Sequence, residues 1–279
     1  MRQLTFDRID LSILSKNEVL MKNIHPTAII HPEAQIGEGV VIGPFAVIGE
    51  QVRIGQGSQI GAHAILFNWT TIGTNCEIHA GVVIGDNPQI KGYKHEESYC
   101  FIGDNNVIRE YVTIHRGWHK GDATKIGNNN FLMANTHIAH DCQIGDNVIM
   151  ANAATLGGHV EVEDNAFISG LVGIHQFVRI GTLSMVGGCS KVVQDVPPYA
   201  LTDGHPACVS GLNMIGMRRA GITSQVRGLL KKVYQLLYHS GVNTNQALSM
   251  IRDEFEMTPE IEHLVRFVES AKRGICQVP

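Results

Sequence analysis

The sequence predicts an all-β, hexapeptide-repeat parallel β-helix followed by a small α-helical C-terminal domain. Aliphatic residues recur at every sixth position from Ile24 to Val192, and they keep one phase across two interruptions. After Asp195 the apolar period changes from six to about 3.6 residues, which is typical of helices. A fixed short repeat indicates a solenoid, and a period of six indicates a parallel β-helix.

The grid residues are expected to point inward and to form one continuous apolar stack. They are Ile24, Ile30, Ile36, Ile42, Ile48, Ile54, Ile60, Leu66, Ile72, Ile78, Ile84, Ile102, Ile108, Ile114, Ile126, Leu132, Ile138, Ile144, Met150, Leu156, Val162, Ile168, Ile174, Ile180, Val186 and Val192. Three hexads close one triangular coil, and coils stack at about 4.8 Å, the spacing of neighbouring strands. Residues 18 positions apart therefore lie on successive coils.

Two segments interrupt the repeat without changing its phase, near residues 86–101 and 116–125. Both are too polar for a coil face, so we expect them to loop out of the helix. Loops on a rigid scaffold often carry function, but tolerated decoration is an equal alternative on composition alone.

The two ends of the chain lie outside the repeat. Residues 1–23 are expected to form an N-terminal extension, the β-helix to span 24–195 and a helical domain to span 196–279, capping the solenoid. One helix is marked by an apolar face from Val226 to Leu237, and a second is expected near 245–256. A third begins at Thr258-Pro259, with Thr as N-cap and Pro at the first helical position.

Composition excludes several classes of protein. The chain has 279 residues, a formal net charge of −4 and a pI near 6.4, which argues against a nucleic-acid binder with a wholly basic surface. No apolar run reaches the length of a transmembrane helix. The first ten residues lack the apolar stretch of a signal peptide, so a cytoplasmic protein is expected. Six scattered cysteines argue against a disulfide framework.

Coil arithmetic brings several histidines together. His140 and His159 are 19 residues apart, and His159 and His175 are 16 apart, so all three fall near one column on adjacent coils. His137 is one strand position away, and Asp141 follows His140. The column is either a polar surface ladder or a site that holds a general base or a metal.

Two functional interpretations follow from this column. His137, His140 or His159, and His175 could ligate zinc, as in β-helices of the gamma carbonic anhydrase type. Alternatively, a neutral histidine removes a proton from an acceptor hydroxyl in acyl transfer. Backbone N–H groups near a glycine would then hold the oxyanion.

The segments 137–142 (HIAHDC), 157–159 (GGH) and 175–177 (HQF) resemble a known family, as do residues 185–190 and 195–199. They are similar to the UDP-N-acetylglucosamine acyltransferases, which begin lipid A synthesis. The resemblance covers residues 21–274. It disfavours the carbonic anhydrase interpretation and implies a homotrimer of left-handed β-helices, with active sites between subunits. The substrates would be a 3-hydroxyacyl acyl carrier protein and a UDP-sugar, with no metal or cofactor, no nucleic acid and no stable membrane insertion.

The resemblance also implies roles for individual residues. His140 would take the proton from the 3-hydroxyl of the sugar, Asp141 would orient His140, and the Gly158 N–H would hold the oxyanion. The positions that match substrate-binding residues are His137, His159, His175, Gln176, Gly188, Asn213 and Arg219. Among these, Gly188 would set acyl length, and Asn213 and Arg219 would hold the uridine and phosphates.

A basic stretch in the helical domain would suit the acidic carrier protein. Its residues are Arg218, Arg219, Arg227, Lys231 and Lys232. The alternative is that the two lysines are simply the solvated face of a helix.

The sequence departs from the family pattern at three positions that normally contact the acceptor. Ile90 and Gly92 stand where most relatives carry an acid and a lysine in the first inserted loop, and Ile215 replaces an acid after Asn213. Since a site that lacks its polar partners loses affinity or suits another ligand, a 3-amino analogue of the sugar is an alternative acceptor. A non-catalytic scaffold and the N-acyltransferase that acts later in the pathway are two further hypotheses.

Overall fold

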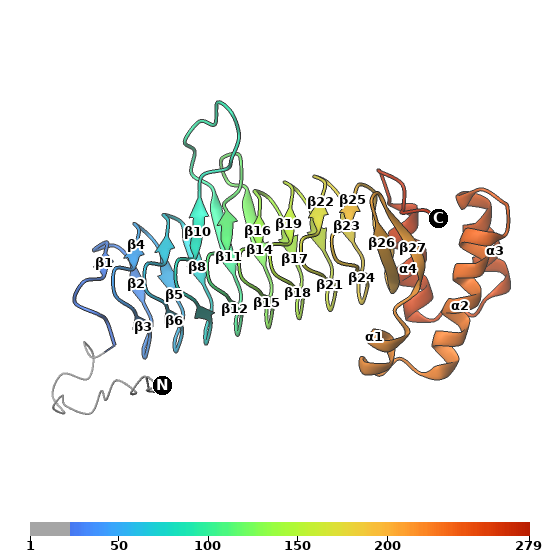
Figure 1. Ribbon diagram of the computed structural model, residues 1–279, viewed down its shortest axis with the longest axis horizontal. Helices are drawn as coiled ribbons and strands as arrows, with labels where there is room; N and C mark the ends of the chain where they lie inside the picture. The colour runs from blue at the N-terminus through green and yellow to red at the C-terminus, as the bar shows by residue number, and fades with distance from the viewer. Residues whose placement is uncertain (1–22) are drawn as a thin grey trace, which may run out of the picture.

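The computed structural model describes residues 23–279 and shows an elongated three-sided β-helix that ends in a group of helices (Figure 1). All but one of the strand pairings are parallel, and three sheets form the three faces. The predicted hexapeptide β-helix with a helical C-terminal part is therefore confirmed. Of the predicted N-terminal extension, residues 1–22 lie outside the part of the chain that the structure describes.

Each coil contributes one short strand to each sheet. The nine-stranded sheet contains β1 (Ile29–Ile30), β4 (Val47–Ile48), β7 (Ile65–Leu66), β10 (Val83–Asp86), β13 (Thr113–His115), β16 (His137–Ile138), β19 (Thr155–Leu156), β22 (Gly173–Ile174) and β25 (Lys191–Val192). The eight-stranded sheet contains β2 (Gln35–Ile36), β5 (Arg53–Ile54), β8 (Thr70–Ile72), β11 (Tyr99–Ile102), β14 (Ala123–Ile126), β17 (Gln143–Ile144), β20 (Glu161–Val162) and β23 (Arg179–Ile180). The ten-stranded sheet contains β3 (Val41–Ile42), β6 (Gln59–Ile60), β9 (Glu77–Ile78), β12 (Val107–Ile108), β15 (Phe131–Leu132), β18 (Ile149–Met150), β21 (Phe167–Ile168), β24 (Met185–Val186), β26 (Ala200–Gly204) and β27 (Ala207–Leu212).

The grid residues form the core, as the six-residue period predicts. Ile138 pairs with Leu156, which in turn pairs with Ile174, so each grid residue stacks on the one 18 positions later. Ile138 and Leu156 are fully buried. Because the side chains of a strand alternate between its faces, the residue before each grid position points outward and is available for contacts.

The chain turns sharply at three corners. The first corner joins the nine-stranded sheet to the eight-stranded sheet, the second leads on to the ten-stranded sheet, and the third returns to the nine-stranded sheet. At the first corner Asp141, His159 and Phe177 have φ of 61°, 57° and 66°. Residues other than glycine rarely adopt this left-handed backbone conformation. Its repetition every 18 residues therefore stacks these three side chains in a column.

Both interruptions leave the helix as loops, and the two loops contact each other. They connect β10 to β11 and β13 to β14, and the first projects farthest from the β-helix (Figure 1). Ser98 Oγ donates to Gly117 O at 2.6 Å, and the Gly117 N–H donates to Tyr99 O. Both loops are shorter than the predicted spans. Residues 99–102 and 123–126 pair as strands β11 and β14.

The C-terminal part contains α1 (Met214–Arg219), α2 (Ser224–His239), α3 (Thr244–Glu254) and α4 (Pro259–Glu269). The three predicted helices correspond to α2, α3 and α4, and Thr258 caps α4 ahead of Pro259 as expected. The hairpin β26–β27 was not predicted. It extends the ten-stranded sheet beyond Asp195. The expected helical domain therefore begins with two strands before its first helix. The boundary between the two domains stays a prediction.

Polar contacts attach the helices to the end of the β-helix. Arg179 donates to the Asp195 carboxylate at 2.9 Å and to the carbonyl of Phe267. His263 on α4 lies 2.8 Å from a carboxylate oxygen of Glu163. Among residues 23–279 no helix has both the length and the apolar character needed to cross a membrane.

Candidate active site

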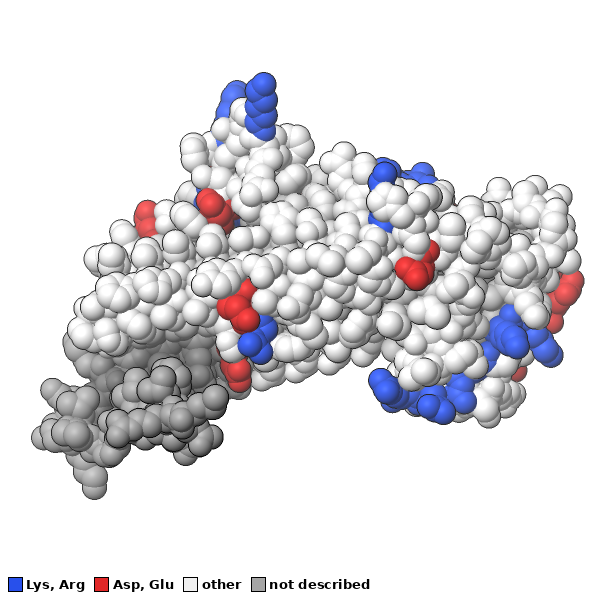
Figure 2. All heavy atoms as spheres, viewed as in Figure 1, with Lys and Arg blue, Asp and Glu red and all other residues white. Residues whose placement is uncertain are grey.

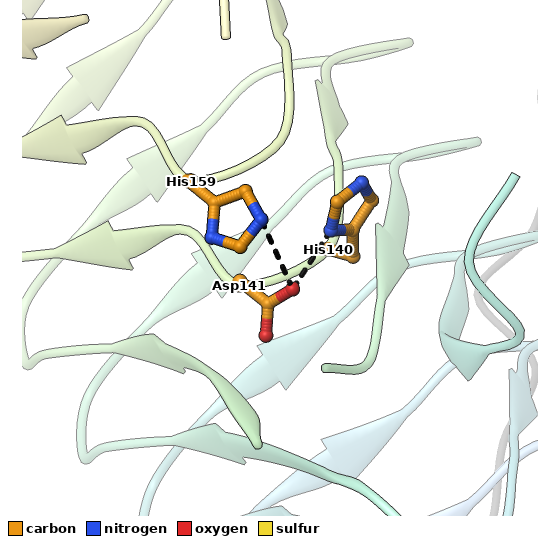
Figure 3. Close-up of side chains that lie close together, drawn as sticks. All are labelled: His140, Asp141 and His159. Atoms are coloured by element: carbon orange, nitrogen blue, oxygen red, sulfur yellow. Dashed lines mark hydrogen bonds and ion pairs between the residues drawn. The ribbon is translucent and has the colours of Figure 1, made fainter. Parts of the chain in front are cut away.

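The predicted catalytic residues meet at the first corner of the β-helix. His140 and Asp141 lie between β16 and β17. Gly158 and His159 occupy the same corner one coil later, between β19 and β20. The His159 N–H donates to His140 O at 3.0 Å, which joins the two turns. Figure 3 shows both imidazole rings directed at the carboxylate of Asp141.

His140 and Asp141 form a hydrogen-bonded pair with restricted exposure. His140 Nδ1 lies 2.8 Å from Asp141 Oδ2, and the side chains are 13% and 9% exposed. Because a carboxylate only accepts, Nδ1 is the protonated nitrogen in the neutral ring, and Nε2 carries a free lone pair. The pair can therefore supply a general base directed away from Asp141.

Asp141 is itself held from two sides. Its backbone N–H donates to Thr124 Oγ1 at 2.8 Å, and Thr124 is fully buried. The Trp118 N–H donates to both carboxylate oxygens, at 3.3 Å to Oδ1 and 3.2 Å to Oδ2. The Trp118 contact orients the carboxylate and the Thr124 contact fixes the backbone of Asp141, so the two together hold the carboxylate in place as the partner of His140.

Gly158 lies against the ring of His140. A Cβ built at Gly158 would be 2.5 Å from His140 Cε1 and 2.6 Å from Nε2, so any side chain there displaces the ring. Within residues 23–279 the Gly158 N–H has no protein acceptor, whereas the N–H groups of Gly157 and His159 both donate to carbonyls. An unpaired backbone donor on a residue that lies against the His140 ring suits the stabilisation of an oxyanion.

Aromatic rings line the dyad on both sides. The His140 ring makes edge contacts with Trp118 at 5.5 Å and with His159 at 5.1 Å. His159 stacks on Phe177, with ring centroids 4.7 Å apart and an interplanar angle of 9°. These contacts fix the plane of the His140 ring, since each neighbouring ring limits its rotation.

His137 points outward from β16. It is close in sequence to His140 and Asp141, but its side chain contacts other residues. Its Nδ1 is 2.8 Å from Thr113 Oγ1, and its ring lies 5.3 Å from that of His115. Burial, assisted by repulsion from His115, lowers the pKa of His137 to about 4. His137 is therefore neutral at physiological pH and acts as a hydrogen-bonding group.

The base of the first inserted loop is anchored next to His137. His115 Nδ1 bonds to the carbonyl of Asn87, and Arg116 donates to the side chain of Asn87. The Arg116 guanidinium lies over the Trp69 ring, 4.9 Å from its centroid. These buried contacts hold the loop at the edge of the candidate site.

His175 and Gln176 line a shallow hollow one coil beyond His159. The hollow has a volume of about 350 Å³, and its walls also include Thr155, Gly157 and Lys191. His175 is exposed, and its Nδ1 lies 3.1 Å from the carbonyl of Gln176. The hollow continues the histidine column, and both residues line its wall.

Three predicted binding residues lie away from the first corner in this chain. Gly188 is exposed at the third corner, between β24 and β25. Asn213 caps α1 and donates from Nδ2 to the carbonyl of Leu183 at the second corner. Arg219 is exposed at the end of α1. Within one chain, therefore, these residues do not share a corner with His140.

Lys and Arg side chains gather over the helical end and at the tip of the first inserted loop (Figure 2). Arg218, Lys231 and Lys232 are exposed, as are Lys91 and Lys94 in the loop. Arg227 is half-buried and donates to the carbonyl of Ile222. The helical domain therefore presents a basic surface although the chain is acidic overall.

The three-histidine zinc set considered from the sequence is not the set that the fold assembles. Among residues 23–279, the group of ligand-type side chains close enough to share an ion is His140, Asp141 and His159. His137 instead contacts Thr113 and His115, and His175 Nδ1 faces the backbone carbonyl of Gln176. The arrangement suits a histidine base with an orienting acid.

Sequence reasoning missed Trp118, Thr124 and Phe177 as parts of the site. Phe177 lies 18 positions after His159, so the same coil arithmetic would have found it. Thr124 lies at the end of the predicted second interruption but is fully buried on β14, which the repeat does not signal. Trp118 carries the weakest signal, because it lies inside a loop that follows no repeat.

The chain was compared with family models and curated proteins. Residues 195–276 match the model described as UDP N-acetylglucosamine O-acyltransferase, domain 2. Residues 123–158 match the model described as bacterial transferase hexapeptide, and residues 24–120 match the model described as GMPPB C-terminal domain. The acyl-[acyl-carrier-protein]–UDP-N-acetylglucosamine O-acyltransferases of Alkalilimnicola ehrlichii and Thermodesulfovibrio yellowstonii are each 50% identical over 258 residues. Both matches cover 92% of this chain and 100% of the relative.

Solved structures give the same result. The LpxA structure from Acinetobacter baumannii superposes with a TM-score of 0.88 at 42% identity, covering 91% of this chain and 100% of that one. The UDP-N-acetylglucosamine acyltransferase from Bacteroides fragilis superposes with a TM-score of 0.87 at 41% identity, covering 91% and 99%. Fold and sequence are therefore shared over nearly the whole length.

Proposed function

Because the chain belongs to the family of acyl-[acyl-carrier-protein]–UDP-N-acetylglucosamine O-acyltransferases, we propose that it catalyses the reaction for which these relatives are named. It transfers a 3-hydroxyacyl chain from acyl carrier protein to the 3-position of UDP-N-acetylglucosamine. This reaction starts lipid A biosynthesis.

The observation that carries the mechanism is the His140–Asp141 pair beside the free N–H of Gly158. His140 Nε2 removes the proton of the sugar 3-hydroxyl as the oxygen attacks the thioester carbonyl. The C–O bond forms, and the resulting oxyanion accepts a hydrogen bond from Gly158. The intermediate then expels the thiolate, which takes its proton from the His140 imidazolium. Asp141 stabilises that imidazolium and holds the tautomer.

We propose that the active enzyme is a homotrimer. The outward row of the ten-stranded sheet is apolar over six successive coils, with Val107, Phe131, Ile149, Phe167, Met185 and Leu201 all half-buried. An apolar stripe of this length on an outer face marks an interaction surface. A neighbouring copy seated on it would bring Gly188, Asn213 and Arg219 of one subunit toward the His140 corner of another.

The predicted binding roles fit this assembly. His137, His159, His175 and Gln176 line one wall of the groove and contact the acceptor and the acyl chain. From the other wall, Arg219 offers a planar donor for the pyrophosphate. The basic surface of the helical domain attracts acyl carrier protein, which is acidic. The six free thiols suit a reducing, cytoplasmic location.

A specific observation favours a second acceptor, the 3-amino analogue of the sugar. Ile90 and Gly92 lie in the first inserted loop where an acid and a lysine are usual, and Ile215 is 57% exposed where another acid is usual. Lys91 and Lys94 are exposed in the same loop and are the nearest substitutes for the missing lysine. Since the polar contacts to the 3-hydroxyl sugar are reduced, discrimination against an amino group is expected to be reduced as well.

The test is acyl transfer measured side by side on the two sugar nucleotides. The purified protein is incubated with 3-hydroxyacyl carrier protein and either UDP-N-acetylglucosamine or its 3-amino analogue, and the product masses identify ester and amide. Transfer to either acceptor supports the reaction class, and the ratio of the two kcat/KM values decides the acceptor. Absence of acyl transfer to both would refute the proposed function.

A further inference from the structure

We propose that the catalytic corner is also an inhibitory zinc site, formed by His140, Asp141 and His159. The ion is an inhibitor and not a cofactor, since the mechanism above needs no metal. The inhibitory part of this proposal rests on the proposed acyl transfer, whereas the binding part stands on the geometry of the three side chains.

The three side chains present suitable ligand atoms to one point. One nitrogen of each imidazole and one carboxylate oxygen all lie within 4.8 Å of one another. His140 Nδ1 is 2.8 Å and His159 Nε2 is 3.7 Å from the same oxygen, Asp141 Oδ2 (Figure 3). Zinc binds imidazole nitrogen and carboxylate oxygen at about 2.0–2.2 Å, so tetrahedral ligands lie about 3.4 Å apart. The two observed separations lie on either side of that value.

The surroundings favour a bound ion. The Trp118 N–H bonds to the Asp141 carboxylate and orients it as an outer-shell partner orients a ligand. The rings of Trp118 and Phe177 hold the two imidazoles in place. The His159 side chain is 32% exposed, which leaves an open side for entry and for a water as fourth ligand.

Zinc at this position removes the base without removing any residue. Coordination through His140 Nδ1 moves the ring proton to Nε2, and the imidazole stays neutral. His159 coordinates through Nε2 and keeps its proton on Nδ1. His140 Nε2 then donates a hydrogen bond toward the sugar and cannot accept the proton of the 3-hydroxyl. The expected effect is a fall in kcat.

Binding is tested by titrating the full-length protein, purified without a histidine tag and treated with chelator, with zinc chloride in a calorimeter. We expect one ion per chain. His159→Gln and Asp141→Asn should each weaken binding by more than about tenfold, because the loss of even an outer-shell partner has an effect of that size. His79→Gln is the matched control. His79 Nε2 lies 3.8 Å from Glu77 Oε2 at strand β9 of the ten-stranded sheet. The control substitution therefore breaks a histidine–acid pair away from the candidate site.

Inhibition is then measured as kcat in zinc-buffered solutions, with recovery on adding EDTA. Cobalt substitution gives a readout independent of activity, since tetrahedral cobalt with nitrogen ligands absorbs visible light and the band should be lost in His159→Gln. Binding that is equal in wild type, His159→Gln and Asp141→Asn would overturn the site. Wild-type zinc binding with unchanged kcat would overturn the inhibition. A protein that shows no transfer in zinc-free buffer would instead refute the proposed function, and the titration would still decide the zinc site.

Discussion

The backbone N–H of Trp118 donates to both carboxylate oxygens of Asp141, at 3.3 and 3.2 Å. Trp118 belongs to the second inserted loop, and that loop is fastened to the first by Ser98 and Gly117. The interruptions of the repeat are therefore structural supports of the His140–Asp141 pair. On composition alone, decoration is an equal explanation.

Asp141→Asn is predicted to inactivate the enzyme while preserving its fold. The amide keeps an oxygen for the Trp118 N–H and turns its NH₂ group toward His140 Nδ1. His140 must then carry its proton on Nε2, so it is no longer a base. We expect kcat to fall by about 10²–10⁴. The measurement is steady-state transfer on protein whose thermal unfolding matches wild type.

The matched control for this change is Asp164→Asn at the second corner. Asp164 Oδ1 also accepts a backbone N–H, that of Asp146 at 2.8 Å, but within the described part of the chain it has no histidine partner. Its kcat should stay at the wild-type level. Equal losses in the two variants would argue against an orienting role for Asp141.

His140→Ala is predicted to remove the general base and to lower kcat by about 10²–10⁴. KM should change less than kcat, because His140 acts mainly on the reacting proton. The control is His63→Ala, which removes an exposed corner histidine that stacks on Phe45. Near-normal turnover of a folded His140→Ala enzyme would exclude His140 as the base.

His137→Gln is predicted to make stability less dependent on pH. Burial and His115 lower the pKa of His137 to about 4, below its ordinary value near 6.5. The unfolded chain therefore binds this proton first, and the associated stability is complete above about pH 6.5 and lost as pH falls toward 4. Glutamine keeps a polar partner for Thr113 but does not titrate.

The measurement for His137 is the difference in Tm between about pH 7.5 and about pH 5, within the window set by the lowered pKa. This difference should be smaller in His137→Gln than in wild type. A difference that is equal or larger in the variant would show that His137 titrates alike in the folded and unfolded protein.

Ile149→Glu is predicted to dissociate the proposed homotrimer. Ile149 points outward on β18, between Phe131 and Phe167 of the neighbouring strands. A carboxylate buried there without a partner is strongly unfavourable. Light scattering should show a monomer with little transfer activity. Lys125→Glu on the eight-stranded sheet is the control, because that residue is exposed on a polar face.

Wild-type protein that is a stable, active monomer would contradict the assembly itself. Loss of the trimer in both variants would instead mean that the interface includes the eight-stranded sheet.

Gly188→Met is predicted to shift donor preference to shorter 3-hydroxyacyl chains. A Cβ at Gly188 meets only the carbonyl of Gly170 at 3.5 Å and Ser169 Cβ at 4.0 Å, so the fold accepts a side chain there. The longer side chain then occupies the groove. We expect kcat/KM for long donors, relative to short ones, to fall by about tenfold or more.

A competition between donors of different length measures this ratio within one sample, so partial loss of active protein does not affect it. An unchanged ratio would show that Gly188 lies away from the chain terminus. Preference of the wild-type enzyme for the shortest donors would contradict the open groove.

The repeat made much of this protein accessible from sequence. In a solenoid each residue lies beside the one 18 positions away, so spacing converts directly into neighbours. The buried stack through Ile138 and Leu156, and the approach of His140 to His159, follow from that rule alone. The Thr258 cap follows from local backbone hydrogen bonding, which needs only nearby residues.

Where the repeat stops, separation along the chain no longer measures distance. The Trp118 amide reaches Asp141 from 23 residues away, through a loop whose course depends on its contacts with Ser98 and Gly117. The absence of a side chain at Gly158 matters only because the His140 ring lies on it. Sequence alone therefore determined the coil, its core and the histidine column. Tertiary structure decided which groups orient the pair, because those contacts join segments that share no period.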